Sequence, residues 1–224
     1  MISFVIPSHN YGYLITNCIL SILKNEKKLV KEIIIINDSS NDNTDQIIKK
    51  LKKRYKKIKY FKKGFKNLSK TMNFGISKTT GKIICKVDAD DSINPSFAKK
   101  TYDFFLKSKS DFVYSNVIIN DKIKKKKYIK KQISNTFIKN LFYPLGSGCL
   151  FKKKVWEKVG GYNEKNFYQD DYDFWLKIKK TKGIKINHFD RALYIYNKHE
   201  NNMSKNILKK NLTKIKILLQ NTFN

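Results

Sequence analysis

The sequence predicts an α/β fold in which a central, mostly parallel sheet is flanked by helices in a single domain. The first half alternates short apolar runs with amphipathic segments, which is the pattern of βα units around a parallel sheet. The run "EIIIIN" (32–37) is apolar without interruption, as expected of a strand buried on both faces. Polar and acidic residues follow each apolar run, at the sheet edge where open α/β folds bind ligands.

The elements of the first half follow from these patterns. "SFVI" (3–6) predicts a strand that ends before Pro7, and Leu14, Cys18 and Ile22 then recur at helical spacing. After them we expect, in order, a strand over 32–37, helices over 43–55 and 69–77, and a strand over 82–87.

The second half is less regular. "DKIKKKKYIKKQ" (121–132) is so basic that we expect a solvated loop or hairpin. "MSKNILKKNLTKIKILLQNTF" (203–223) predicts a basic amphipathic helix that either packs on the domain or lies on a membrane surface. The other expected elements are a helix over 95–108, a strand over 111–119, a glycine-rich turn entering a strand over 146–153, and a helix over 170–180.

The charge of the chain is strongly positive, with 48 Lys and Arg against 18 Asp and Glu and a formal net charge of +30. A basic surface favours nucleic-acid binding because it releases counterions from the phosphate backbone. However, Arg54 and Arg191 are the only arginines, so 46 of the 48 basic residues are Lys. Because base readout and phosphate forks favour the planar guanidinium, this composition argues against a nucleic-acid partner.

The cysteines and the N-terminus indicate the compartment. Cys18, Cys85 and Cys149 are widely spaced and odd in number, which favours neither a disulfide framework nor a zinc site. "MISFVIPSHN" has no features of a signal peptide, and no stretch has the roughly 18 to 20 apolar residues needed to cross a bilayer. We therefore predict a cytoplasmic protein.

Three acidic side chains, Asp88, Asp90 and Asp91, come directly after the predicted strand over 82–87. Like charges so close together repel one another and are costly to bury unless a cation or several donors meet them. In a loop leaving a strand, Asp88 and Asp90 are placed to reach one divalent ion of the Mg²⁺ or Mn²⁺ kind, which would hold a diphosphate. Asp38, at the end of an earlier strand, is a candidate partner for a base or ribose.

Four segments resemble the motifs of inverting family 2 glycosyltransferases with the GT-A fold. "FVIPSHNYGYLITNCILSIL" is similar to the family's opening strand and helix, and "EIIIINDSSNDNT" to its I-x-V-x-D-D-G-S-x-D-x-T segment. "GKIICKVDADD" resembles the segment that ends in L-D-A-D-D, which carries the D-x-D motif, and "GGYNEKNFYQDDYDFWLKI" resembles the segment with E-D-x-D-L-W. The motifs occur in family order from Ile2 to about Ser204.

The resemblance implies a nucleotide-sugar site built on the first strand ends. Pro7, Ser8 and Asn10 would line the nucleotide pocket, and Asp38 would pair with the base. Asp88 would sit near the ribose or the metal.

It also implies a metal site and a catalytic base. Asp90 would bind the Mn²⁺ or Mg²⁺ ion that bridges the diphosphate, with His199 as a further candidate ligand. Asp171 would be the general base that takes a proton from the acceptor hydroxyl. Asp170 and Tyr168 are candidates for the acceptor side.

The sequence departs from the family pattern at several motif positions. Asn37 replaces the first Asp of D-D-G-S, and Ser39 replaces its Gly, so the turn is expected to differ. The acidic pair is Asp170-Asp171 rather than Glu-Asp, and Lys177 replaces the usual Arg, which removes a bidentate fork.

The sequence thus predicts a hexosyltransferase-like inverting enzyme of bacterial surface-polysaccharide assembly. The expected donor is a UDP-sugar and the acceptor a glycan or a lipid-linked glycan, on the inner face of the membrane or in the cytoplasm. The predicted parts are a nucleotide-binding half (1–92), an acceptor-binding half (93–202) and the C-terminal helix (203–224). Two alternatives stay open: a basic nucleic-acid-binding protein, and a metal-dependent nucleotidyltransferase, although "PSHNYGYL" lacks the phosphate loop expected of the latter.

Overall fold

The computed structural model describes residues 1–132, 144–165, 169–202, 212–214 and 217. Its strands are β1 (Ile2–Ser8), β2 (Val30–Asp38), β3 (Ile58–Lys63), β4 (Ile83–Lys86), β5 (Ser92–Ile93), β6 (Phe112–Asp121), β7 (Lys126–Lys130), β8 (Leu150–Lys152) and β9 (Ile186–Lys198). Its helices are α1 (Gly12–Leu23), α2 (Thr44–Arg54), α3 (Leu68–Ser77), α4 (Phe97–Lys107), α5 (Lys153–Lys158) and α6 (Asp170–Lys180).

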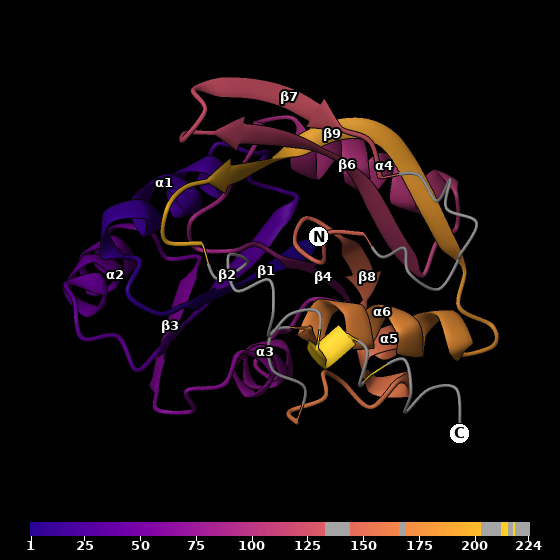
Figure 1. The fold of residues 1–224 in the computed structure, drawn as a ribbon, viewed down its shortest axis with the longest axis horizontal. Coiled ribbons are helices and arrows are strands. Elements are labelled where there is room, and N and C mark those ends of the chain that lie inside the picture. The colour runs from indigo at the N-terminus through magenta and orange to yellow at the C-terminus, as the bar shows by residue number, and fades with distance from the viewer. Residues whose placement is uncertain (133–143, 166–168, 203–211, 215–216, 218–224) are drawn as a thin grey trace.

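All the strands belong to one curved sheet with the order β3-β2-β1-β4-β8-β6-β9-β5, and β7 pairs with β6 (Figure 1). The strands β3, β2, β1 and β4 run parallel to one another, β8 is antiparallel to both β4 and β6, and β6 is parallel to β9. The predicted α/β architecture with a mostly parallel sheet is therefore confirmed. Because β1 to β4 are parallel, their carboxyl ends meet at one edge.

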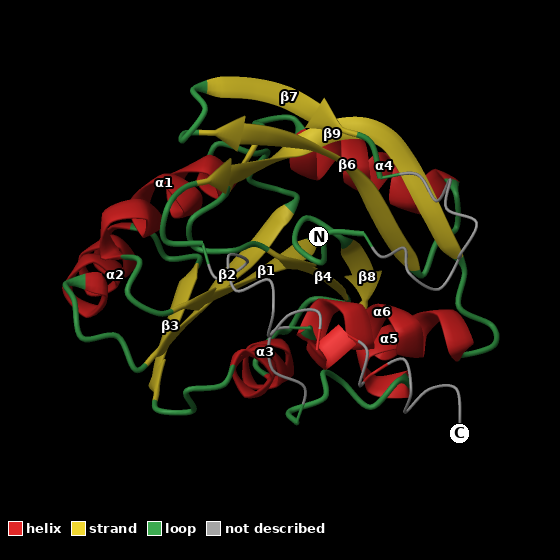
Figure 2. Ribbon diagram, in the orientation of Figure 1, coloured by secondary structure: helices red, strands yellow, loops and turns green. Residues whose placement is uncertain are grey.

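Helices cover both faces of the sheet (Figure 2). The helices α1, α2 and α4 contribute side chains to one hydrophobic cluster, and α3, α5 and α6 contribute to the other. Within β2, Ile33 and Ile35 belong to the first cluster, whereas Ile34 and Ile36 belong to the second. The uninterrupted apolar run is thus buried on both faces, as predicted.

The basic run 121–132 forms the turn and the second strand of a hairpin. β7 pairs antiparallel with the end of β6, with Ile118 opposite Ile129 and Asp121 opposite Lys126. Every residue of β7 is exposed. Of the two expected states for this run, the hairpin is the correct one.

Most of the predicted C-terminal helix, 203–224, lies outside the described residues. Residues 212–214 are helical, and Ile217 is buried in a cluster with Tyr172 and Leu176 of α6. Within the described part of the chain, no helix has the length and apolar character needed to span a membrane.

Candidate active site

The loops that follow β1 and β2 are joined by hydrogen bonds. The backbone N–H of Asn10 donates to Ser40 Oγ at 2.9 Å, and the N–H of Asn41 donates to Asn10 Oδ1 at 2.9 Å. Ser8, at the end of β1, is 3% exposed, and its hydroxyl has no hydrogen-bond partner among the described residues. A buried hydroxyl without a partner at a strand end is available to a ligand.

Asp38 ends β2, and its carboxylate is fully engaged by the chain. Oδ1 accepts hydrogen bonds from Ser39 Oγ at 3.1 Å and from the N–H of Lys66 at 2.8 Å. Oδ2 accepts from the N–H of Asn67 at 3.1 Å and from Thr71 Oγ1 at 2.8 Å. Because a carboxylate has about four acceptor sites, a base that pairs with Asp38 must displace one of these donors.

Ser39 stands where the family pattern has glycine. Its φ is +62°, in the left-handed region that favours glycine. Asn37 holds the same turn, since its Oδ1 accepts from the N–H of Ser40 at 3.2 Å and its Nδ2 donates to Tyr60 Oη at 3.2 Å. The two departures from the motif are thus accommodated locally.

Asp90 and His199 lie together although they are far apart in the sequence. Asp90 Oδ2 is 3.0 Å from His199 Nε2 and accepts from Asn202 Nδ2 at 3.1 Å. Burial and the negative charge of Asp88 raise the pKa of Asp90, whereas the hydrogen bond from His199 lowers it. The site is therefore electrically suited to a cation.

Asp90 and His199 are the residues that would hold a metal ion. Their 3.0 Å separation is that of an ordinary hydrogen bond, which an ion would have to replace. Among the described residues, no group of three or more His, Cys, Asp and Glu side chains is arranged to hold a metal. The chain thus offers this pair, and oxygen atoms of a diphosphate would have to complete the shell.

Asp91 connects the acidic loop to β9. Its carboxylate accepts from Tyr194 Oη at 2.7 Å and from the N–H of Asn197 at 2.8 Å. Asn197 Nδ2 also donates to the carbonyl oxygen of Asp90 at 2.8 Å. Asp91 is 1% exposed, so this member of the acidic triplet has a structural role and does not face a ligand.

Asp88 has different partners from Asp90. Its Oδ2 accepts from Ser147 Oγ at 2.5 Å, and its Oδ1 lies 3.6 Å from the ammonium nitrogen of Lys86. The sequence predicts a divalent ion at Asp88 and Asp90; the charge that the structure places beside Asp88 is that of Lys86, on the preceding strand. Nothing had singled out this lysine, which sits inside the apolar run "KIICKV".

Lys86 also reaches the first turn of α6. Its Nζ donates to Asp171 Oδ1 at 3.0 Å and to Oδ2 at 2.9 Å, and Asp170 Oδ2 lies 3.9 Å away. Burial by itself lowers the pKa of a lysine, but the carboxylates of Asp171, Asp88 and Asp170 outweigh it and raise the pKa of Lys86 well above its usual value. One buried cation therefore joins the end of β4 to the start of α6.

The two acidic residues at the start of α6 differ in exposure. The side chain of Asp171 is 22% exposed, whereas that of Asp170 is 11% exposed and its Oδ2 has no hydrogen-bond partner in the described part of the chain. Burial, followed by the charge of Asp171, raises the pKa of Asp170 to about 7. Both residues also complement the positive end of the helix dipole.

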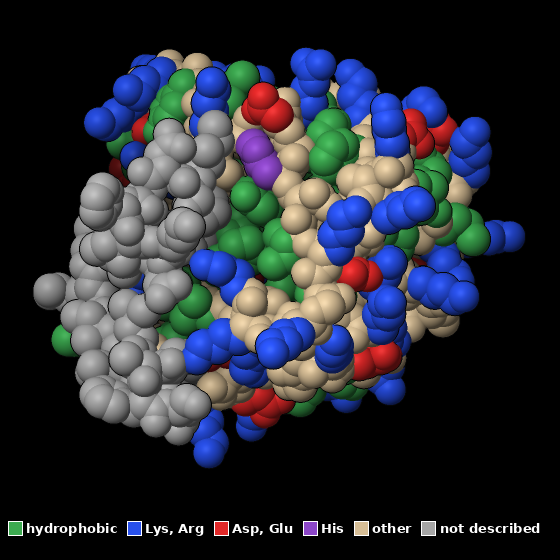
Figure 3. Space-filling model, turned by 90° about the vertical axis from the view of Figure 1, so that its right-hand side faces the viewer, with side chains coloured by type: hydrophobic (Ala, Val, Ile, Leu, Met, Phe, Trp, Pro, Cys, Tyr) green, Lys and Arg blue, Asp and Glu red, His purple; other side chains and the backbone are tan. Residues whose placement is uncertain are grey.

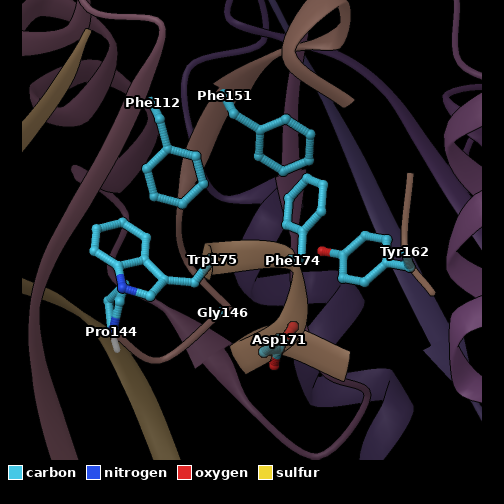
Figure 4. A pocket seen from close by; sticks show the side chains of 8 residues that line it. All are labelled: Phe112, Pro144, Gly146, Phe151, Tyr162, Asp171, Phe174 and Trp175. Carbon is cyan, nitrogen blue, oxygen red and sulfur yellow. The ribbon is translucent and has the colours of Figure 1, made fainter. Parts of the chain in front are cut away.

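The carboxylate of Asp171 borders a small, mainly aromatic cavity of about 10 Å³ (Figure 4). Its lining is Phe112, Pro144, Gly146, Phe151, Tyr162, Asp171, Phe174 and Trp175. A water molecule needs several polar partners, and this lining offers few of them. The cavity therefore forms an apolar backing for Asp171.

The structure brings the predicted residues together in three groups. Pro7, Ser8, Asn10 and Asp38 lie at the ends of β1 and β2; Asp90 meets His199; and Asp88, Asp170 and Asp171 surround one buried lysine. Tyr168 lies outside the described residues. Lys177, which replaces the family's Arg, donates to the carbonyl oxygen of Gly161 at 3.0 Å and is 3.6 Å from Asp173.

Comparison with known proteins agrees with these features. The family model for glycosyl transferase family 2 matches residues 3–186. Chondroitin synthase of Pasteurella multocida is 28% identical over 213 residues, which is 91% of this chain but 21% of that protein. The O-antigen biosynthesis glycosyltransferase WbnJ of Escherichia coli is 28% identical over 216 residues, 93% of this chain and 84% of its own length. The chain thus spans about a fifth of the synthase and most of WbnJ.

Solved structures share the fold. TarS of S. aureus (residues 1–349), in complex with UDP-GlcNAc, superimposes with a TM-score of 0.75 at 19% identity, covering 90% of this chain and 59% of that one. The mannosyltransferase PcManGT from Pyrobaculum calidifontis, in complex with GDP-Man and Mn²⁺, gives 0.76 at 12% identity, covering 100% of this chain and 64% of that one. The fold is GT-A-like, and because the family model matches most of its length, this chain belongs to glycosyl transferase family 2.

Proposed function

We propose that this protein transfers a sugar from a UDP-sugar to a hydroxyl group of a glycan or lipid-linked glycan, with inversion, in bacterial surface-polysaccharide assembly. The observation that carries the proposal is one contact: Lys86, the last residue of β4, donates hydrogen bonds to the carboxylate of Asp171 and also lies beside Asp88. This contact sets a partly exposed carboxylate beside the strand end that would hold the donor. The UDP-GlcNAc bound to TarS and the names of the two relatives above support the donor and the pathway.

The chemistry follows from the position of Asp171. Its carboxylate accepts the proton of the acceptor hydroxyl while that oxygen attacks the anomeric carbon of the sugar. The new bond joins the acceptor oxygen to the anomeric carbon, and the bond to the nucleoside diphosphate breaks on the opposite side, which inverts the configuration. A Mn²⁺ or Mg²⁺ ion held by Asp90 and His199, when bound, would supply positive charge to the leaving diphosphate.

The nucleotide would lie over the ends of β1 and β2. The unpartnered hydroxyl of Ser8 is available to it, and Pro7 and Asn10 flank that hydroxyl along the chain. Asp38 organises the wall of this pocket through its four donors, and base pairing by Asp38 would exchange one of them for the base. Asp88, 29% exposed, would lie near the ribose or the metal.

A calorimetric titration with UDP, GDP and dTDP, each with Mn²⁺ and again with EDTA, tests the donor site. We expect metal-dependent binding of UDP that Asp90→Asn abolishes. Asp103→Asn is a matched control, because Asp103 is a 58% exposed aspartate of α4 that pairs with Lys99. Failure of all three nucleotides to bind, together with salt-sensitive binding of RNA or DNA, would overturn the proposal in favour of a nucleic-acid-binding protein.

The assignment of Asp171 needs an activity assay. UDP release from UDP-GlcNAc is measured with a panel of mono- and disaccharide acceptors, and Asp171→Asn is expected to bind UDP as the parent does while losing transfer. An Asp171→Asn variant that transfers sugar at the parental rate would contradict the role of base. Release of N-acetylglucosamine 1-phosphate instead of UDP, with transfer of UMP to the acceptor, would point to a nucleotidyltransferase.

We also propose that the β6–β7 hairpin attracts the protein to an anionic membrane surface. The run 121–132 contains seven lysines, and the side chains of Ile123, Tyr128 and Ile129 in it are 47%, 45% and 62% exposed. Lysines are also spread over the face shown in Figure 3, with acidic side chains scattered among them. Basic surfaces with exposed apolar side chains suit the headgroup region of anionic bilayers.

Vesicle sedimentation tests this contact. Each lysine near an anionic surface contributes about 1 kcal/mol, so three substitutions are expected to weaken binding to phosphatidylglycerol vesicles by about 100-fold. The test variant changes three exposed lysines of β7 to Gln: Lys126, Lys127 and Lys130. The control removes the same charge from α2, at Lys50, Lys52 and Lys53. Equal losses in the two variants would show that only net charge matters.

A further inference from the structure

Lys86 is a positive charge held inside the protein. Its side chain is 2% exposed, and a buried ammonium group is costly unless it is paired. The carboxylates of Asp88, Asp170 and Asp171 all lie within 3.9 Å of its Nζ. Replacing a buried ion pair by well-packed apolar side chains is often neutral or stabilising, so stability alone is a weak explanation for this lysine.

The contacts of Lys86 fix one carboxylate more tightly than the others. Both oxygens of Asp171 accept from the same Nζ, at 3.0 and 2.9 Å, which fixes the rotation of the carboxylate as well as its position. Gly146 borders the same group, because a Cβ built there would lie within 2.6 Å of the carboxyl carbon and both oxygens of Asp171. The carboxylate is thus held between an ammonium group and a bare backbone.

The other end of the contact is a rigid strand. Lys86 pairs with Val5 of the central strand β1, and its carbonyl oxygen accepts from the N–H of Gly148 at 2.9 Å. Asp88 follows it by two residues and contacts the same Nζ at 3.6 Å. A side chain held by helices and strands is placed more accurately than one held by a loop, and Asp171 is held by both α6 and β4.

We propose that Lys86 is a positioning residue that holds the carboxylate of Asp171 in the place and rotation from which it accepts the proton of the acceptor. This inference rests on the proposed function, because it requires Asp171 to be the base. Lys86 itself neither gives nor takes a proton in the reaction. Since β4 leads directly into the loop that holds Asp88 and Asp90, the lysine sets the base relative to the donor-binding end of the sheet.

A double-mutant cycle tests the inference in the full-length protein. The parent is compared with Lys86→Met, Asp171→Asn and the double variant, with UDP-GlcNAc as donor, the saccharide panel as acceptors and UDP release as the signal. Lys86→Met is expected to lower kcat by about 100-fold, as for a misplaced catalytic group, and to leave the KM for the donor within about threefold. In the Asp171→Asn background the same substitution is expected to change kcat by less than about twofold.

A conservative variant and a control separate positioning from folding. Lys86→Arg keeps a charged donor for the carboxylate and is expected to retain more kcat than Lys86→Met. Lys152→Met removes another lysine that forms an ion pair, 2.8 Å from Asp111, and is expected to keep the parental kcat. If Lys86→Met does not fold, Lys86→Gln, which still offers a neutral donor of similar length, replaces it in the cycle.

The outcomes distinguish this inference from the function on which it rests. A parental kcat in Asp171→Asn would contradict the base assignment and the proposed function with it. An inactive Asp171→Asn together with a parental kcat in Lys86→Met would overturn the positioning role alone. An equal loss from Lys86→Met in the presence and absence of the Asp171 carboxylate would also overturn it, because the lysine would then act through another group.

Discussion

Gly146→Ala is the substitution that probes the geometry of the base most directly. The φ of Gly146 is outside the positive region, so alanine is compatible with its backbone, and the added methyl group is the only new feature. That carbon would lie within 2.6 Å of the carboxyl carbon and both oxygens of Asp171, whereas ordinary contacts begin at 3.4 Å. The carboxylate must therefore move by about 1 Å or rotate away from the lysine.

A displacement of this size is large for catalysis. Misplacing a catalytic group by about 1 Å lowers the rate by about 100-fold, so kcat for UDP release with acceptor is expected to fall by this factor. UDP binding measured by calorimetry is expected to stay within about threefold of the parent, because the first strand ends are untouched. Gly64→Ala is the matched control, since its Cβ would meet only Ser39 Oγ, at 4.0 Å.

The result that would refute this reasoning is a Gly146→Ala variant with the parental kcat. The backbone at residue 146 would then be able to move away from the added methyl group, and the contact between Lys86 and Asp171 would not define the position of the carboxylate. The thermal unfolding curve of Gly146→Ala is expected to shift to lower temperature, because the displaced carboxylate pairs less well with the buried Lys86. The kcat values are therefore compared at a temperature at which both proteins are folded.

Three further predictions concern stability. Burial and the charge of Asp171 raise the pKa of Asp170 from 3.8 to about 7, so the folded state keeps this proton to a higher pH than the unfolded chain, and the parent loses stability as the pH rises from about 4 to about 7. In urea unfolding at about pH 5 and about pH 8, Asp170→Asn should lose less free energy of unfolding between the two pH values than the parent does. Equal losses in parent and variant would contradict the shift. Glu32 is buried, and hydrogen bonds from Lys59, Ser3 and Thr80 outweigh burial and lower its pKa from 4.5 to about 2. The ionised Glu32 contributes at most about 3 kcal/mol of stability, which is present above pH 4.5 and lost toward about pH 2. In Glu32→Gln the free energy of unfolding should therefore fall less between these pH values than in the parent. An equal fall in the two proteins would count against this reasoning. Tyr194→Phe removes a donor from the buried carboxylate of Asp91 and should lower the free energy of unfolding by about 1 to 3 kcal/mol, whereas a change below about 0.5 kcal/mol would argue against that hydrogen bond.

The apolar pattern predicted the buried part of the fold and missed the rest for a physical reason. β1, β2 and β4 are buried on both faces, so their sequences are continuously apolar and were recognised. β3 and β9 were not predicted, since "IKYFKK" lies at the sheet edge with lysines outward and "INHFDRALYIYNK" mixes polar and apolar residues in a half-buried strand. Their strand character depends on pairing partners that no local pattern reveals.

The candidate site, like the fold, could be predicted from the sequence only in part. Motif resemblance identified Asp88, Asp90 and Asp171, but the residue that joins two of them, Lys86, is 85 positions from Asp171 in the sequence. A signal existed, because a lysine inside an apolar run is a buried charge that needs partners. The partners themselves could not be inferred, since α6 reaches β4 only through the tertiary fold.

The link between Asp91 and β9 has a consequence for dividing the chain. Asp91 belongs to the first ninety-odd residues, yet the donors for its buried carboxylate come from Tyr194 and Asn197, more than a hundred residues later. A fragment of residues 1–92 would leave that carboxylate without these donors and would also lack His199. The acidic loop therefore depends on β9 for the donors of its buried carboxylate, and a cut after residue 92 would separate the two.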